Sequence, residues 1–405
     1  MLRGMPREVS VIAAIAFCVA LGYGIVAPAI PIYARSFGVS AFLAGAVVSV
    51  FALMRLVSAL GAGVLIDRAG ERVILTSGLI FVAVSSVLAG LAADYTQLLV
   101  LRGVGGIGSS MFTVSAMALM LKVVHPDQRG RAAAAFQAGF LLGGVAGPAV
   151  GGLVLAWSVR APFFVYAGTL AMAAIVSWRY LPSEPPGTPI VTDPEEPTEP
   201  ASPSITLVGA LKMRAYWTAL CANLTNGIVS FGLRFSLVPL FVIEGLNSGA
   251  SLAGIGFLVA AASQAALLMP AGRMADTRGR RPALLFGTLL TAIGMGALVV
   301  TQAPVTFVVA MAVAGAAGAF MGSAPAAVAG DIVGAAGKGT VIAVFQMTAD
   351  LGVILGPLLA GLLADSWGFG PAFAVGAAVA LLAFVAAVIM PETLGASRRA
   401  SGSGP

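Results

Sequence analysis

Charged side chains are scarce in this sequence, and their scarcity decides the class of protein first. Only 9% of the 405 residues are charged, whereas 59% are hydrophobic. A soluble domain carries roughly 25% charged residues. Most of this chain is therefore not built to be surrounded by water.

Cysteine and histidine are almost absent, which argues against metal, disulfide and most enzyme chemistry. The two cysteines, Cys18 and Cys221, lie inside hydrophobic runs and have no metal-site or redox spacing. The single histidine, His125, lies in a charged loop, and no phosphate-binding glycine loop is present. We therefore expect no enzyme activity, no metal and no cofactor. If the protein drives an energy-requiring process, its energy source is an ion gradient, and we expect a proton gradient.

Long hydrophobic runs are abundant. We count twelve runs of about 19 to 28 residues, each long enough to span a hydrocarbon core of about 30 Å as a helix. Helices are predicted because a lipid-exposed backbone must satisfy its own hydrogen bonds. The runs Val9–Tyr33, Tyr216–Ile243 and Val305–Ala329 are expected to be continuous helices. A cleaved signal peptide is the alternative for the first run, but its length and the eleven runs that follow favour a membrane helix.

The basic residues give the orientation of the helices. If the N-terminus is cytoplasmic, only Arg35 and Arg160 of the 22 Lys and Arg residues fall in loops on the opposite side. Such a bias is typical of cytoplasmic loops. We therefore predict that both termini are cytoplasmic and that the net charge of +6 reflects topology, with no nucleic-acid partner. The Ala- and Gly-rich composition favours a bacterial inner membrane.

The chain repeats itself at an offset of 209 residues. Phe136-Gln137 matches Phe345-Gln346, and Gly147-Pro148 matches Gly356-Pro357. An even number of helices in each copy keeps the copies parallel in the membrane. The fold class predicted is an all-α polytopic membrane protein with two pseudo-symmetric six-helix bundles, acting as a monomer. The expected domains are bundles at 1–180 and 211–392, a Pro-rich disordered linker at 181–210, and a short tail at 393–405.

A charged turn occurs twice, as GVLIDRAGER from residue 63 and as GRMADTRGRR from residue 272. The glycines allow a tight turn and close helix approach. The aspartates can accept hydrogen bonds from free N–H groups at a neighbouring helix start, and the arginines can bridge to carboxylates or helix C-termini. We predict a cytoplasmic latch; the alternative is that basic loops merely fix topology. The latch residues are Gly63, Asp67, Arg68, Gly70, Arg72, Gly272, Asp276, Gly279, Arg280 and Arg281.

The first of these turns resembles the loop signature of the major facilitator superfamily, whose twelve-helix plan covers nearly the whole chain. LGYGIVAPAIP, from Leu21, resembles the first-helix motif of the drug:proton antiporter branch. GFLLGGVAGPAVGG, from Gly139, and GVILGPL, from Gly352, resemble the antiporter motif of its fifth helix and the eleventh-helix counterpart. The resemblance implies alternating access and a substrate site near the membrane midplane.

Glycines in these two motifs recur along one helix face, which lets a second helix pack closely. From the residues alone, these glycines could serve to pack helices within one bundle, or they could lie at the contact between the halves. The resemblance implies that the fifth helix lines the contact between the halves and disfavours leakage. The motif residues are Gly139, Gly143, Gly147, Pro148, Gly151, Gly352, Gly356 and Pro357.

Four ionisable residues lie inside the hydrophobic runs: Arg55, Arg102, Arg234 and Asp350. Such residues are costly in lipid and usually face a partner or a cavity; the alternative is a structural charge. Their repeat counterparts carry no charge, which marks them as candidate functional residues. Arg55 and Asp350 are expected to form an ion pair between the halves, with Asp350 as the best proton-coupling group. Arg102 is expected nearer the outer surface; RGVGGIGSS resembles a family motif linked to proton transfer, but Gly105 stands where Gln is expected.

The substrate cavity is expected to contain Arg234 with Tyr23, Asn223 and Asn226. The first and fourth helices carry no carboxylate, so the charge of the interior favours a neutral, zwitterionic or anionic amphiphile.

The function predicted is secondary active transport, as proton-coupled efflux of a drug-like or hydrophobic metabolite that gives multidrug resistance. The alternatives are a proton symporter importing a small nutrient or organic anion, and a membrane receptor that transports nothing. The expected partners are a small-molecule substrate, protons and the lipid bilayer.

Overall fold

The computed structural model describes residues 6–124, 129–182, 206–333 and 339–394, and it divides into two compact units. Unit 1 spans Met1–Glu196 and unit 2 spans Pro197–Pro405. Most of the predicted linker and of the predicted tail lies outside the described residues. One part of the linker prediction is wrong: Leu207–Leu211 forms a short helix, α8. The Thr206 hydroxyl caps this helix by accepting a hydrogen bond from the Gly209 N–H at 3.2 Å.

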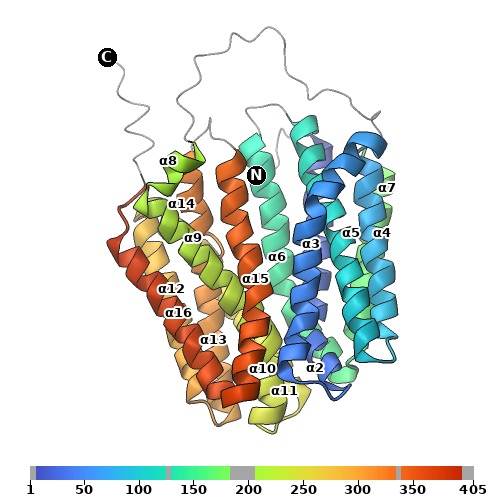
Figure 1. Cartoon of the computed structure of the whole chain (residues 1–405). Helices are drawn as coiled ribbons and strands as arrows, with labels where there is room; N and C mark the ends of the chain where they lie inside the picture. The colour runs from blue at the N-terminus through green and yellow to red at the C-terminus, as the bar shows by residue number, and fades with distance from the viewer. Residues whose placement is uncertain (1–5, 125–128, 183–205, 334–338, 395–405) are drawn as a thin grey trace. The chain divides into compact units, whose positions relative to one another are not determined.

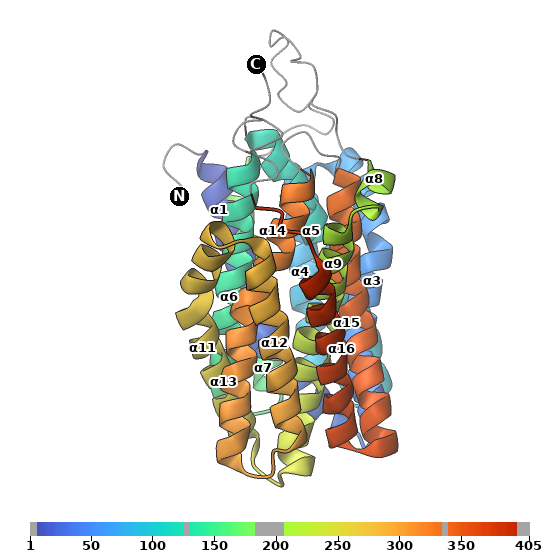
Figure 2. The same cartoon turned by 90° about the vertical axis from the view of Figure 1, so that its left-hand side faces the viewer.

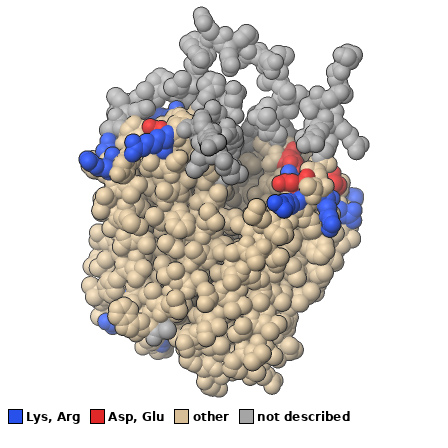
Figure 3. Space-filling model, turned by 180° about the vertical axis from the view of Figure 1, so that it is seen from behind, with Lys and Arg blue, Asp and Glu red and all other residues tan. Residues whose placement is uncertain are grey.

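Within the described residues, twelve helices are long and apolar enough to cross a membrane, which confirms the predicted fold class. They span Arg7–Arg35, Ala41–Ala69, Glu71–Gly90, Tyr95–Met120, Ala135–Leu155, Ala161–Tyr180, Arg214–Gly245, Ala250–Thr277, Arg280–Val299, Pro304–Val333, Thr340–Trp367 and Phe369–Ile389. Figure 3 shows that, on the face drawn, charged side chains gather at the ends of the helices and that the surface between these ends shows none. This distribution suits a lipid-facing surface.

Unit 1 contains seven helices among its described residues (Figure 1). They are α1 (Arg7–Val26), α2 (Ala29–Arg35), α3 (Ala41–Ala69), α4 (Glu71–Gly90), α5 (Tyr95–Val123), α6 (Arg129–Trp157) and α7 (Ala161–Tyr180). Helix α1 packs against α6 and α7, and α5 packs against α3 and α4. Side-chain caps start two of these helices: Ser40 accepts from the Leu43 N–H at 3.3 Å, and Asp94 accepts from the Gln97 N–H at 2.8 Å.

Unit 2 repeats this packing with its own helices (Figure 2). They are α8, α9 (Arg214–Asn226), η2 (Gly227–Leu237), α10 (Val238–Leu240), η3 (Phe241–Gly245), α11 (Ala250–Thr277), α12 (Arg280–Val299), α13 (Pro304–Met321), α14 (Ala324–Val333), α15 (Gly339–Trp367) and α16 (Phe369–Ile389). Segment η2 packs against α15 as α1 packs against α6, and α13 packs against α11 and α12 as α5 packs against α3 and α4. The two units therefore share one internal plan.

Three helices expected to be continuous are not regular. The first is interrupted between α1 and α2 at Pro28, and the tenth is interrupted between α13 and α14. Proline lacks an amide hydrogen, so it weakens the helix that precedes it. The seventh spanning helix changes at Gly227 into a π-helix of 11 residues, η2, and the Val238 N–H bonds to the carbonyl of Leu233. π-Helical turns are rare and frequently lie at functional sites.

Candidate transport residues

Each of the two charged turns contains one glycine that its backbone conformation requires. Gly70 has a φ of 82° and Gly279 has a φ of 122°, a backbone conformation that other residues rarely adopt. Close helix approach at Gly63 and Gly272 stays a prediction. Both lie within helices, and a side chain built there would meet no described atom within 4 Å.

In unit 1 the turn is held by an ion pair between the start of α4 and the end of α5. Lys122 Nζ lies 2.5 Å from Glu71 Oε1, and the two side chains are 14% and 7% exposed. Arg72 donates a hydrogen bond to the backbone carbonyl of Trp178 near the end of α7, and its guanidinium lies 4.6 Å from the Trp178 ring centroid. We call Glu71 and Lys122 the unit 1 clasp. Asp67 and Arg68 are exposed at the end of α3.

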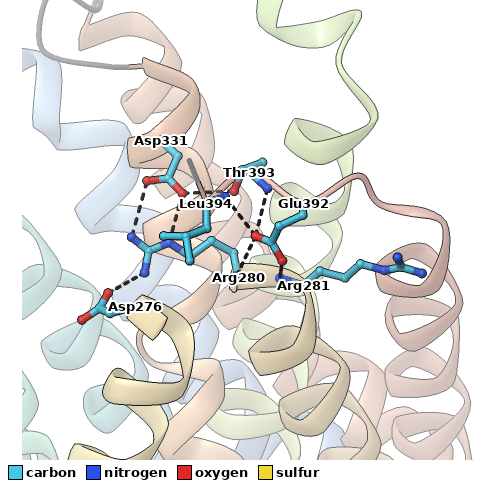
Figure 4. Close-up of polar contacts among 7 residues, drawn as sticks. All are labelled: Asp276, Arg280, Arg281, Asp331, Glu392, Thr393 and Leu394. Carbon is cyan, nitrogen blue, oxygen red and sulfur yellow. Dashed lines mark hydrogen bonds and ion pairs between the residues drawn. The ribbon is translucent and has the colours of Figure 1, made fainter. Parts of the chain in front are cut away.

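In unit 2 the corresponding turn is held by a larger network (Figure 4). Arg280 bridges Asp276 at 2.6 Å and Asp331 of α14 at 3.0 Å. The Thr393 hydroxyl donates to Asp331 at 3.0 Å. Glu392 accepts from the backbone N–H groups of Arg280 and Arg281, at 2.8 and 3.1 Å. We call Asp276, Arg280, Asp331, Glu392 and Thr393 the unit 2 clasp.

Glu392, and not Asp276, accepts the free N–H groups at the start of α12. Asp276 instead pairs with the Arg280 side chain one turn away. The predicted role of the arginines is confirmed at two places within the units, because Arg72 and Arg281 donate to backbone carbonyls near the ends of α7 and α16. These carbonyls belong to the C-terminal turns, where positive charge is favourable.

The clasps of the two units have opposite polarity. At the 209-residue offset, Glu71 corresponds to Arg280 and Lys122 corresponds to Asp331. Each pair joins the same two places in its unit, with acid and base exchanged. The exchange also changes the helix start, because α4 carries the acid Glu71 in its first turn whereas α12 carries none. Glu392 supplies that negative charge from beyond α16.

The glycine rows pack helices inside each unit. A side chain at Gly147 would lie 2.6 Å from the carbonyl oxygen of Leu21, and one at Gly151 would lie 2.7 Å from that of Ile25. Gly139 and Gly143 face the α1 backbone in the same way. The glycine face of α6 is therefore covered by α1. Contact of α6 with the other half stays a prediction.

The eleventh-helix motif packs against the π-helical segment of unit 2. A side chain at Gly352 would lie 2.6 Å from the carbonyl oxygen of Leu224, and one at Gly356 would lie 2.8 Å from Gly232. Pro148 and Pro357 follow Gly147 and Gly356 inside their helices. The two motifs thus occupy equivalent places in the two units.

Arg102 is buried among the helices of unit 1, and its expected depth near the outer surface stays a prediction. The residue is 1% exposed, and its guanidinium lies 4.4 Å from the ring centroid of Phe51. Tyr23 and Tyr166 lie close enough to interact with it electrostatically, and the Tyr23 ring is 6.0 Å from Phe51 and 6.4 Å from Tyr166. Nε and Nη2 have no hydrogen-bond partner among the described residues. We call Phe51, Tyr23 and Tyr166 the aromatic cage.

The absence of the expected glutamine also has a reason in the packing around Arg102. A side chain at Gly105 would lie 2.6 Å from Ser85 Oγ and 3.5 Å from the Phe51 ring. Glycine here leaves room for the Ser85 hydroxyl, whereas the contact with Phe51 would be of ordinary length.

The four residues predicted to form a substrate cavity are not brought together within one unit. Tyr23 belongs to the aromatic cage of unit 1. Asn223 is 8% exposed and donates to the Phe345 carbonyl at 2.7 Å, which ties α9 to α15. Asn226 accepts from the Ser230 hydroxyl at 2.8 Å. Arg234 lines a cavity, which it shares with Ser230, Thr291, Met295 and Ala314.

Arg55 lies on α3 and Asp350 lies on α15, and both are half-buried. They belong to different units, and their pairing stays a prediction.

Sequence reasoning missed Glu71, Lys122, Asp331 and Glu392 as clasp residues. One available signal was the repeat itself, since acid matches base at both pairs of positions. It also missed Phe51 and Tyr166, for which an aromatic residue in a hydrophobic run gives no signal.

Comparison with known proteins identifies the family. The model of the Major Facilitator Superfamily matches residues 12–262 and again residues 219–405. This chain belongs to the Major Facilitator Superfamily. Its membership accounts for the twelve helices and for the repeat, and it indicates a membrane transporter rather than an enzyme.

Individual members of the superfamily are similar to this facilitator at low identity. An uncharacterized MFS-type transporter of Methanocaldococcus jannaschii is 24% identical over 90% of this chain and 93% of its own length. The quinolone resistance protein NorA of Staphylococcus aureus is 29% identical over 42% of this chain, and the match spans 44% of that protein. Among solved structures, a bacterial homologue of the lysosomal transporter Spinster has a TM-score of 0.73 at 19% identity, with 97% of this chain and 96% of that chain covered. The human organic anion transporter MFSD10 has a TM-score of 0.65 at 17% identity, with 95% and 100% covered.

Proposed function

We propose that this facilitator is a proton-coupled exporter of drug-like or hydrophobic metabolites that works by alternating access in a bacterial inner membrane. The observation that carries the proposal is Arg102, a buried guanidinium whose Nε and Nη2 have no hydrogen-bond partner among the described residues. An arginine at the centre of a membrane helix costs about 3 kcal/mol on insertion scales, and such residues mark ion and proton pathways. Similarity of part of the chain to a quinolone resistance protein supports export as the direction.

The roles of the charged residues follow from this proposal. Arg102 holds positive charge beside the phenol groups of Tyr23 and Tyr166, where it lowers the cost of a nearby negative charge or of a moving proton. Asp350 is the carboxylate that binds and releases the proton, and separation of Asp350 from Arg55 accompanies each cycle. The two clasps hold the starts of α4 and α12 in one conformation of the transport cycle and release them in the other.

The test is transport by the purified full chain in liposomes with an imposed proton gradient. A fluorescent hydrophobic dye should be moved only when the gradient is present, and an uncoupler should stop the movement. Inverted membrane vesicles give the direction, because an exporter accumulates dye inside them. Asp350→Asn should abolish gradient-driven movement while leaving dye counterflow intact. Dye movement in Asp350→Asn that still follows the proton gradient would exclude Asp350 from coupling, and import in cells would reverse the direction.

A further inference from the structure

Arg234 lines a cavity inside unit 2. Among the described residues, no carboxylate lines this cavity to balance the positive charge of Arg234. The cavity has room for about one water molecule, and all of its lining residues belong to η2, α12 and α13. Arg234 Nη1 donates one long hydrogen bond, 3.5 Å, to the carbonyl of Ala314. Its Nε is fully buried and has no partner among the described residues. A positive charge in this place is therefore under-satisfied.

The aromatic contact at Arg234 is weaker than the one at Arg102. The guanidinium of Arg234 lies 5.3 Å from the centroid of the Phe235 ring, compared with 4.4 Å between Arg102 and Phe51. Arg102 is enclosed by the aromatic cage, whereas Arg234 has a cavity beside it. Arg234 is half-buried and its buried Nε has no partner among the described residues, so a compensating group would stabilise it, and the cavity leaves space for that group.

The backbone around Arg234 is also special. The residue lies in the π-helix η2, and Pro239 just beyond it cannot donate to the turn below. Gly227 and Gly232 of η2 pack against α15, so this helix is held close on one side while Arg234 points to the other, toward α12 and α13. π-Helical turns of this kind are frequent at binding sites.

The other groups at the cavity suit an oxyanion. Ser230 and Thr291 bring two hydroxyl groups, which now donate to the Asn226 amide oxygen at 2.8 Å and the Gly287 carbonyl at 2.7 Å. Both hydroxyls can rotate toward a negatively charged oxygen. The remaining lining residues, among them Met295 and Ala317, are apolar. No carboxylate lines this cavity in the part of the chain that is described.

We propose that Arg234, Ser230 and Thr291 form an anion subsite that takes one oxygen of the carboxylate or sulfonate head group of the transported molecule. This inference rests on the proposed function, and it makes organic anions with an apolar body the preferred cargo. The small cavity admits only the head-group oxygen. The planar guanidinium then offers Nε and a terminal nitrogen to the head group, a geometry that favours oxyanions over halides.

The test measures binding without transport, so that it stands apart from proton coupling. The purified full chain in lipid nanodiscs is titrated with 2-naphthalenesulfonate, with the neutral 2-naphthalenesulfonamide, and with inorganic sulfate. We expect the sulfonate to raise the unfolding temperature and to bind at least about tenfold more tightly than the sulfonamide, a difference of about 1.4 kcal/mol. Arg234→Gln should remove this preference, and Arg234→Lys should keep part of it. The control Arg273→Ala changes an exposed arginine of the same unit and should keep all of it.

Three results would overturn the subsite. The first is equal binding of the sulfonate and the sulfonamide by the unchanged protein. The second is an Arg234→Gln protein that folds with unchanged stability and keeps the preference. The third is inorganic sulfate stabilising as strongly as the naphthalenesulfonate, which would make the site one for free anions. Sulfonate binding at Arg234 in a protein that shows no proton-driven flux would support the subsite and overturn the proposed function alone.

Discussion

The two units share one packing plan but place their charges differently. At the turn between the second and third spanning helices, unit 1 has its acid on α4 and its base on α5, and unit 2 has the reverse on α12 and α14. In the interior, Arg102 extends from α5 toward Tyr23 of α1, whereas Arg234 extends from η2 toward Ala314 of α13. Ala314 is the repeat counterpart of Gly105, one turn from Arg102. Each unit thus has a guanidinium between the same two helices, supplied from opposite sides.

The comparison teaches that a duplicated fold preserves the place of a charge pair better than the identity of its members. Position-by-position matching of the repeat gives Met311 and Ile25 as the counterparts of Arg102 and Arg234. This matching misses the equivalence, because the same space can be filled from either neighbouring helix.

The largest effect should come from replacing the two interior arginines, Arg102 and Arg234. We expect Arg102→Met to reduce proton-driven transport to the level of empty liposomes while the protein stays folded, because an unpaired charge is replaced by an apolar side chain of similar length. Arg234→Gln should instead spare the transport of neutral compounds. Flux assays with both variants measure the difference, and equal losses for neutral cargo in the two variants would contradict it.

The next largest effect concerns the glycine row of α6. Gly147→Leu should destabilise unit 1 by about 3 kcal/mol or more, because a side chain there meets the α1 backbone. Gly144→Leu is the matched control, since a side chain at Gly144 meets no described atom within 4 Å. Thermal unfolding in detergent measures both. Equal unfolding temperatures for the two variants would show that the row does not set the packing.

A medium effect is expected from exchanging the clasp polarity. Glu71→Arg alone should destabilise unit 1, and adding Lys122→Asp should restore it, with a coupling energy of about 1 to 3 kcal/mol. The matching exchange in unit 2, Arg280→Glu with Asp331→Lys, should not be restored, because Asp276 would face the new glutamate. A double-mutant cycle by thermal unfolding tests this, and full recovery in both units would show that Asp276 contributes nothing.

The smallest effect is expected at the start of α12. Glu392→Gln should cost about 1 kcal/mol, because the amide keeps an acceptor but removes the charge that faces the helix start. Hydrogen exchange at the Arg280 and Arg281 amides should rise, while exchange at the start of α4 should not change. Unaltered protection at Arg280 would mean that water replaces the carboxylate at no cost.

The sequence allowed the twelve helices, the repeat and the two turns with their essential glycines to be predicted, because each leaves a local signal. A run of 20 apolar residues or a glycine with positive φ depends on its own neighbours. The residues that pair with one another in the two clasps could not be predicted. Glu392 reaches Arg280 only because α16 ends beside α12, and Lys122 reaches Glu71 only because α5 ends beside α4.

The burial of Arg102 could not be predicted from its depth along the helix. Five residues separate it from Gln97, which indicates a place near the membrane surface. Burial depends instead on which face of α5 it occupies, and that face is closed by Phe51, Tyr23 and Tyr166. The π-helix around Arg234 was likewise not predicted, and two of its glycines, Gly227 and Gly232, pack closely against α15.

All residues of each clasp lie within a single unit, so the charge pairs of one half do not depend on those of the other. After the gene duplicated, one copy could reverse its acid and base without any matching change in the other. The same independence would let halves be exchanged: a hybrid that joins residues 1–180 to the second half of a related facilitator would keep the unit 1 clasp complete, whatever charges that second half carries.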